Sequence, residues 1–296
     1  MKKSSYPLII ISALIIVASV ALLFGGFFSD RFGLNKGTIP VAATIFPLYD
    51  IVRTVGGDAV QVTLLLPEGE SLAAVDHLYD GANLEDLSTI FAIGHGLDTA
   101  GIPEASKSKI FTVDEDVNLM LEQGSTASPY YWLSLRETAS IARNVARKLA
   151  EIDPRNARNY EERLNVFLKN AAYEDQLIRD LLPQAGTDKI AVYGYDWSYF
   201  ARDYDLDIVW FHPPVLEALP DDARSSLDDA VSTYGLVSIF SDMGTDPKPL
   251  LPFTLKGSTS ILTLDTLGGL EDRKSYLQLM AYNARQLFDG LGGKAQ

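Results

Sequence analysis

ARNYEERLNVFLKNAAYEDQLIRDLLP, residues 157–183, is the stretch from which the organisation of the chain can be worked out. Its apolar residues recur at three- and four-residue steps with one skipped turn, which is the spacing of one face of an α-helix. They are Ala157, Tyr160, Leu164, Phe167, Ala171, Ile178 and Leu181. Pro154 and Pro183 interrupt the helical pattern on either side. The spacing predicts one long helix over residues 155–183, able to join two lobes rigidly.

Short apolar, β-branched runs lie on both sides of this helix, separated by segments with helical spacing. The runs before it are Val41–Ile45, Val60–Leu66, Ile90–Ile93 and Ile110–Val113, and those after it are Ile190–Tyr193, Ile208–Phe211, Val237–Phe240 and Ile261–Leu264. Such alternation is typical of parallel strands with crossover helices. We therefore expect an α/β fold with an N-terminal lobe at 39–154, the connecting helix at 155–183 and a C-terminal lobe at 184–296. Ligands of open α/β sheets bind at the carboxyl ends of the strands, which here means the cleft between the lobes.

The N-terminus has the pattern of a membrane anchor. Lys2 and Lys3 precede an uncharged run from Pro7 to Phe28, and a hydrocarbon core needs about 20 apolar residues. We expect residues 1–28 to be an anchor or uncleaved signal and residues 29–38 a tether. The lysines favour the cytoplasmic side, which predicts a single-pass cell-membrane protein with its folded part outside. Ser19-Val20-Ala21 offers a small-x-small cleavage pattern, so cleavage of this segment stays open.

Composition excludes several classes of function. The net charge of -14, from 39 acidic and 25 basic residues, would repel nucleic acid. The chain has no cysteine, which excludes thiolate metal sites and a lipid-modified cysteine as anchor. No phosphate loop, nucleophile elbow or acid–base pair stands out. We expect neither an enzyme nor a catalytic cofactor.

Ordered motifs along residues 39–293 resemble the zinc- and manganese-binding receptors of ABC importers, the group of periplasmic solute-binding proteins typified by TroA and ZnuA. The segment SPYYWL at residues 128–133 is similar to the family's Asp-Pro-His-x-Trp-Leu. Other matching segments are VAATIFPLYD at 41–50, VGGDAV at 55–60, Pro67-Glu68-Gly69, EIDP at 151–154, SYFA at 198–201, EALP at 217–220 and LDTLGG at 264–269. The resemblance implies two α/β lobes, capture of a zinc or manganese ion as the transported ligand between them, and delivery to an ABC permease in the membrane.

The expected ligands are where this sequence departs from the family. The family commonly binds metal through three histidines, the third sometimes a glutamate, and one aspartate. Without gaps, the matching positions hold Ala73, Tyr130, Gly194 and Asp265. Alanine and glycine have no ligating side chain, and a neutral tyrosine is a poor zinc ligand. Of the inherited set, Asp265 is the ligand that we expect to remain.

A second register gives a different site. Inserting four residues after Ser71 places His77 in the first motif, and Asp196 brings a carboxylate next to the third position. A site of His77, Asp196 and Asp265 would be rich in oxygen and would favour a hard ion such as manganese.

The cleft is also rich in aromatic side chains. Tyr130 and Tyr195 are expected to line it, where they would suit a small cationic solute through cation–π contacts. A protein of another class, a metal-free surface interaction or structural protein on the same scaffold, is the alternative that the altered ligand positions allow.

Overall fold

The computed structural model describes residues 38–73, 83–121, 127–256 and 259–293. The chain divides into two units, Met1–Thr38 and Ile39–Gln296, and the second unit contains both lobes. The expected anchor, the tether up to residue 37 and the candidate ligand His77 lie outside the described residues. Within the described ranges, no helix has the length and hydrophobicity needed to cross a membrane.

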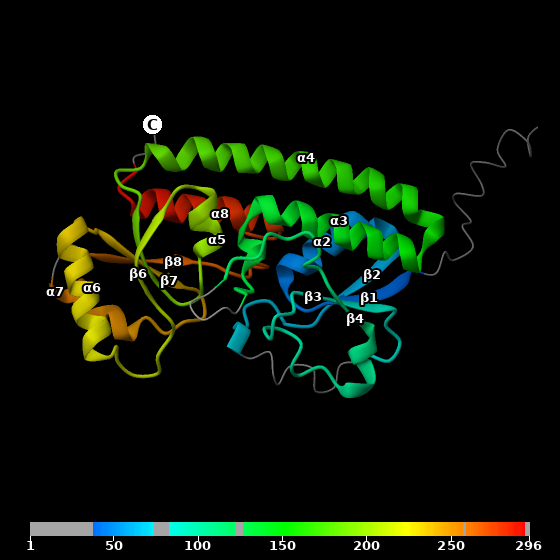
Figure 1. Ribbon diagram of the computed structural model, residues 1–296, viewed down its shortest axis with the longest axis horizontal. Helices are drawn as coiled ribbons and strands as arrows, with labels where there is room; N and C mark the ends of the chain where they lie inside the picture. Colours follow the sequence, from blue (N-terminus) through cyan, green and yellow to red (C-terminus); the bar gives the residue numbers. More distant parts are fainter. Residues whose placement is uncertain (1–37, 74–82, 122–126, 257–258, 294–296) are drawn as a thin grey trace, which may run out of the picture. The chain divides into compact units, whose positions relative to one another are not determined.

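The first lobe is built on a four-stranded parallel sheet with the order β2-β1-β3-β4 (Figure 1). Its elements are β1 (Ile39–Ala43), α2 (Phe46–Gly56), β2 (Val60–Leu64), β3 (Thr89–Ala92) and β4 (Ile110–Thr112). The central strand β1 pairs on both sides, with Val41 opposite Val62 and Thr89. All four residues of β3 are buried. Burial on both faces explains why β3 is almost continuously apolar, whereas the edge strand β2 alternates between more and less buried residues.

The second lobe repeats this plan with the strand order β6-β5-β7-β8, again all parallel. Its elements are β5 (Lys189–Tyr193), α5 (Ser198–Asp203), β6 (Asp207–His212), α6 (Asp221–Tyr234), β7 (Ser238–Asp242), α7 (Leu251–Lys256), β8 (Ser260–Leu264) and α8 (Tyr276–Gly290). The prediction of two α/β lobes with parallel sheets is confirmed.

Two helices connect the lobes along the chain, α3 (Leu135–Ile152) and α4 (Ala157–Leu181). The stripe predicted on residues 157–183 gives α4 its buried face, where Tyr160, Phe167, Ala171 and Ile178 are covered. The helix packs on α2 and α3 and, further along, on α8 of the second lobe (Figure 1). Short 3₁₀ turns complete the described chain: Gly57–Ala59, Glu104–Lys109, Tyr131–Leu133, Pro154–Asn156, Leu182–Gln184 and Lys248–Leu250.

One hydrophobic core runs through both lobes. It includes Val41 and Phe91 from the first sheet, Val192 and Phe240 from the second, and Phe167 from α4. A smaller cluster around Leu227 lies beneath α6. Since a displacement of one lobe against the other would open a close-packed interior, the lobes are expected to move only modestly.

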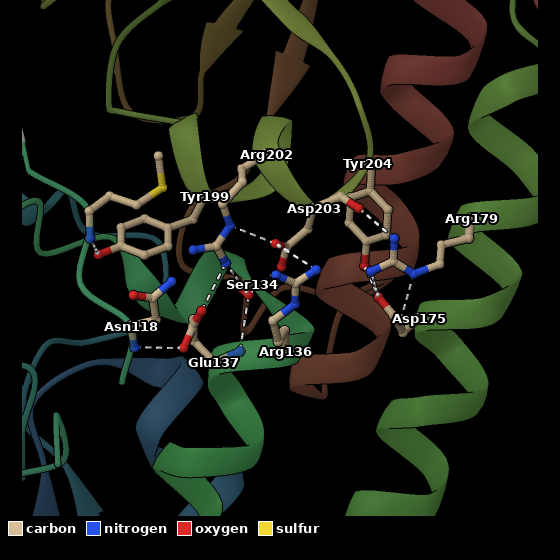
Figure 2. Close-up of polar contacts among 11 residues, drawn as sticks. Asn118, Ser134, Arg136, Glu137, Asp175, Arg179, Tyr199, Arg202, Asp203 and Tyr204 are labelled. Atoms are coloured by element: carbon tan, nitrogen blue, oxygen red, sulfur yellow. Dashed lines mark hydrogen bonds and ion pairs between the residues drawn. The ribbon is translucent and has the colours of Figure 1, made fainter. Parts of the chain in front are cut away.

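A buried network of polar side chains connects α3, α4 and α5 (Figure 2). Ser134 caps α3 by accepting a hydrogen bond from the Glu137 amide at 3.0 Å, and its hydroxyl donates to the buried carboxylate of Asp203 on α5. Arg202 pairs with Asp203 at 2.8 Å and with Glu137 at 2.9 Å. From α4, Arg179 donates to the Asp203 carbonyl at 2.7 Å. Buried charges need such partners, so the network fixes α5 against α3 and α4.

Candidate functional site

Two cavities lie where the strands of the two lobes end. The smaller, of about 20 Å³, is lined from the first lobe by residues 69–71, which follow β2. The second lobe contributes Tyr195 after β5, residues 242–244 at the end of β7, and residues 265–268 with Leu270 after β8. A volume of this size holds about one water molecule, and hence one ion of similar radius. The cavity lies at the carboxyl ends of the strands, where open α/β sheets bind ligands.

Asp265 is the first residue after β8 and is held in a single orientation. Its Oδ1 accepts hydrogen bonds from the amides of Leu267 and Gly268, both at 2.9 Å. Its own amide donates to Oδ1 of Asn283 at 2.8 Å, and its carbonyl accepts from Nδ2 of Asn283 at 2.7 Å. Gly268 has a φ of +79°, which glycine adopts without strain, so the chain can turn back over the carboxylate.

Arg273 completes the surroundings of Asp265. Its Nε donates to Oδ2 of Asp265 at 2.5 Å, and only 5% of the arginine is exposed. Its Nη2 lies 3.2 Å from the sulfur of Met243, and its Cζ lies 4.1 Å from the ring centroid of Tyr282. Arg273 also pairs with Asp272. The guanidinium is therefore fixed by four neighbours and neutralises Asp265 within the fold.

Asp242 is a second carboxylate on the small cavity. Its Oδ2 accepts hydrogen bonds from Nε1 of Trp197 at 3.0 Å and from the hydroxyl of Thr266 at 2.5 Å. Within the described chain, its buried Oδ1 has no hydrogen-bond partner. Burial raises the pKa of Asp242 to about 7, and the nearby Asp265 carboxylate adds to the rise. A cation next to Oδ1 would supply the interaction that this oxygen lacks.

The larger cavity is a groove of about 770 Å³ beside the first, with Tyr130 and Tyr195 in its wall. Their rings lie 5.7 Å apart. Asp196 accepts hydrogen bonds there from Ser128 at 2.7 Å and from the Ser198 amide at 2.9 Å. The Ser128 bond connects the segment before α3 to the segment before α5. Phe211 also lines the groove, which thus has three aromatic rings and one carboxylate as its recognition groups.

The structure distributes the sequence-predicted residues over the two cavities. Asp265 lines the small cavity, while Tyr130, Gly194 and Asp196 line the groove, and Tyr195 lines both. The Tyr195 hydroxyl lies 2.9 Å from that of Ser71, and burial raises the pKa of Tyr195, which keeps it neutral. Over residues 38–73, 83–121, 127–256 and 259–293, no three histidine or carboxylate side chains are grouped closely enough to hold a metal ion.

Two positions of the expected ligand set are occupied by residues without a ligating side chain. Ala73 is exposed, and its amide donates to the Ser71 hydroxyl at 3.3 Å. Gly194 has a φ of +139°, and a Cβ there would lie 2.5 Å from Cβ of Asp242. A side chain at residue 194 therefore conflicts with Asp242 as the backbone stands.

Sequence reasoning missed Asp242 and Arg273. Asp242 could have been predicted, because it follows the apolar run Val237–Phe240 and is the last residue of β7. It therefore lies at the carboxyl edge of the sheet, where ligands bind. Arg273 carried no such signal. It meets Asp265 only because the turn between them, which includes Gly268 and Gly269 at positive φ, folds the chain back on itself.

Comparison with known proteins extends over nearly the whole chain. The manganese ABC transporter substrate-binding lipoprotein ScaA of Streptococcus gordonii is 23% identical, with 98% of this chain and 99% of that protein aligned. The metal ABC transporter substrate-binding lipoprotein ScbA of Streptococcus cristatus is also 23% identical, with the same coverage.

Solved structures share the fold. The crystal structure of ZnuA superposes with a TM-score of 0.73 at 22% identity and covers 86% of this chain and 100% of that one. A manganese-bound periplasmic metal-binding protein from Candidatus Liberibacter asiaticus gives a TM-score of 0.71 at 19% identity, with 86% and 100% covered. The family model described as ZnuA, the periplasmic component A of the zinc-uptake complex, matches residues 41–290. Because that range is most of the sequence, the chain belongs to the ZnuA family.

Proposed function

We propose that this chain is the extracytoplasmic solute-binding component of a metal-type ABC importer, which captures a divalent cation between its lobes and delivers it to a membrane permease. The observation that carries the proposal is the cavity of about 20 Å³ between the lobes, lined by Asp242 and Asp265. It has the size of one ion and contains carboxylate oxygens, at the edge of the sheets where this fold class binds ligands. Relatives named as manganese and metal ABC transporter substrate-binding proteins support the same function.

The chemistry of the lining favours a hard cation. The polar side chains on this cavity offer carboxylate and hydroxyl oxygens, which suit manganese better than zinc. Asp265, His77 and Asp196 stay our proposed ligand residues, of which Asp265 lines the small cavity and Asp196 lines the neighbouring groove. Asp242, whose Oδ1 has no hydrogen-bond partner among the described residues, is a fourth candidate. The ion is cargo, to be bound and released, so a site with few fixed ligands is compatible with the role.

A small organic cation is the second candidate cargo, favoured by the groove rather than by the small cavity. Tyr130 and Tyr195 supply aromatic rings 5.7 Å apart, and Asp196 supplies a negative charge beside them. Aromatic side chains with a carboxylate recognise alkylammonium groups.

For the membrane, we propose attachment through residues 7–28, with the two lobes on the extracytoplasmic side. The relatives are named as lipoproteins. This chain has no cysteine to carry a lipid, so a peptide anchor takes that role. Fractionation of cells that express the whole chain is expected to place it in the membrane, and deletion of residues 7–28 is expected to prevent this. Membrane attachment that survives the deletion would contradict the anchor.

Elemental analysis and thermal unfolding of the whole purified chain test the cargo. We expect manganese or zinc to raise the melting temperature in a saturable way, because a ligand that binds only the folded state stabilises it. Asp265→Asn should reduce the response, and the exposed Asp228→Asn on α6 serves as the matched control. If choline raises the melting temperature of the wild type but not that of the Asp196→Asn variant, the organic cation is favoured as cargo. No bound metal and no shift with any cation at millimolar concentration would exclude receptor function for cations.

A further inference from the structure

Asp265 is the carboxylate that the resemblance assigns to the metal, yet the fold already provides it with a positive partner. Arg273 pairs with Oδ2 at 2.5 Å, and the side chains of Arg273 and Asp265 are 6% and 4% exposed. The two oxygens are both engaged, because Oδ1 accepts from the Leu267 and Gly268 amides. An arginine side chain stays protonated at any physiological pH. Arg273 also pairs with Asp272, but that side chain is 64% exposed and its charge is screened by water. The buried pair of Asp265 and Arg273 therefore carries no net charge before any cargo arrives.

The position of the arginine decides what this pair does to the cavity. Asp265 lines the small cavity, whereas Arg273 is not among its lining residues. The guanidinium thus reaches the carboxylate from outside the cavity and leaves room for an ion within it. An ion in the cavity would meet a carboxylate whose charge is already compensated, with the guanidinium close behind. Two positive charges near one carboxylate repel each other, most strongly where water is excluded.

The guanidinium has little freedom to withdraw. It lies over the Tyr282 ring, contacts the sulfur of Met243 and pairs with Asp272. The turn that carries it is closed by backbone hydrogen bonds, from the Gly269 amide to the Arg273 carbonyl at 3.0 Å and from the Arg273 amide to the Leu270 carbonyl at 2.9 Å. Cargo binding at Asp265 therefore takes place with Arg273 in position.

We propose that Arg273 lowers the affinity of the cleft for divalent cations by neutralising Asp265. The identity of the cargo as a divalent cation rests on the proposed receptor function. The lowered affinity rests on the ion pair between Arg273 and Asp265. It assigns this chain a weak, readily released divalent cargo rather than a tightly held one. Arg273 contacts no cargo itself and acts through the charge that it places beside Asp265.

The test compares the dissociation constant for Mn²⁺ between the whole chain and its variants by titration calorimetry. Arg273→Met removes the guanidinium charge and keeps an unbranched apolar side chain in place of the arginine stem, and it is expected to bind Mn²⁺ about tenfold or more tightly, as the loss of a nearby like charge implies. Arg273→Lys keeps the charge and should stay close to the wild type. Arg285→Met, which removes an arginine that is half-exposed on α8 and paired with Asp289, is the control for loss of any positive charge.

A double variant links the gain to the proposed carboxylate. Asp265→Asn with Arg273→Met should lose the added affinity and should unfold at a temperature close to the wild type, since both charges of the pair are gone. Unchanged Mn²⁺ affinity in Arg273→Met, or a gain that persists in the double variant, would overturn the inference. Failure of the receptor proposal looks different. The wild type would then respond to no cation, while Arg273→Met would still acquire Mn²⁺ binding.

Discussion

Gly194 shows at the scale of one residue why this cleft differs from the family pattern. Its backbone has a φ of +139°, and a Cβ would lie 2.5 Å from Cβ of Asp242. Gly194→Ala is therefore expected to cost about 2 kcal/mol or more, from backbone strain and steric conflict together. Gly235→Ala is the matched control, because Gly235 has a φ of +63° but nothing within 4 Å of the added atom. It should cost about 1 kcal/mol in the same urea titration. Equal losses would show that contact with Asp242 is unimportant.

The raised pKa of Asp242 leads to a prediction of how the stability of the fold depends on pH. Burial raises the pKa of its folded-state carboxyl to about 7, above the value of about 3.9 for an unfolded chain. Between these values the folded state holds a proton that the unfolded state has lost. The stabilisation that the folded state gains from this proton is complete below pH 4. As the pH rises toward 7, the free energy of unfolding falls by at most about 1.4 kcal/mol per pH unit.

Asp242→Asn removes this proton binding, so the free energy of unfolding in metal-free buffer should depend less steeply on pH between 4 and 7. Asp228→Asn, on the exposed side of α6, should leave the slope as it is. An unchanged slope in the Asp242 variant would mean that the carboxyl is ionised throughout this range.

At the scale of an element, the cap of α3 also joins the lobes. Ser134 accepts from the Glu137 amide and donates to the buried Asp203. Ser275 caps α8 in the same way, accepting from the Gln278 amide at 3.2 Å. Ser275→Ala should cost about 1 kcal/mol, the usual value for a cap. Ser134→Ala should cost about 2–4 kcal/mol, since the substitution also removes the hydroxyl that donates a hydrogen bond to the buried carboxylate of Asp203. Urea unfolding of both variants measures the difference, and equal costs would contradict a role of Ser134 beyond capping.

The elements were largely predictable, because each depends on a period in the sequence. The three- and four-residue spacing over residues 157–183 gives α4, and each predicted apolar run corresponds to a strand of a parallel sheet. The surroundings of the candidate site were not. Arg273 reaches Asp265 through the shape of one turn, and Gly194 meets Asp242 across neighbouring strands. Such contacts depend on the three-dimensional path of the backbone, which the spacing of apolar residues in the sequence does not predict.

At the scale of the whole folded unit, the shared core predicts that the two lobes unfold together. The cluster that contains Val41 of the first sheet also contains Phe240 of the second, with Phe167 of α4 in the same cluster. Neither lobe can lose its packing without exposing apolar surface of the other. Native-state hydrogen exchange with increasing urea should give amides of β1 and β5 the same largest opening free energy and the same urea dependence.

Phe167 tests this coupling from the helix that both lobes contact. The side chain is 2% exposed, so Phe167→Ala should cost about 3–5 kcal/mol, and the loss should lower the protection of β1 and β5 equally. Val166→Ala on the same helix is the control, since Val166 is 60% exposed and surface substitutions usually change stability by about 0.5 kcal/mol or less. Loss of protection confined to one sheet would show that the lobes are separate folding units. Equal loss would support a receptor whose lobes close only slightly around a cation, because closure and unfolding would strain the same core.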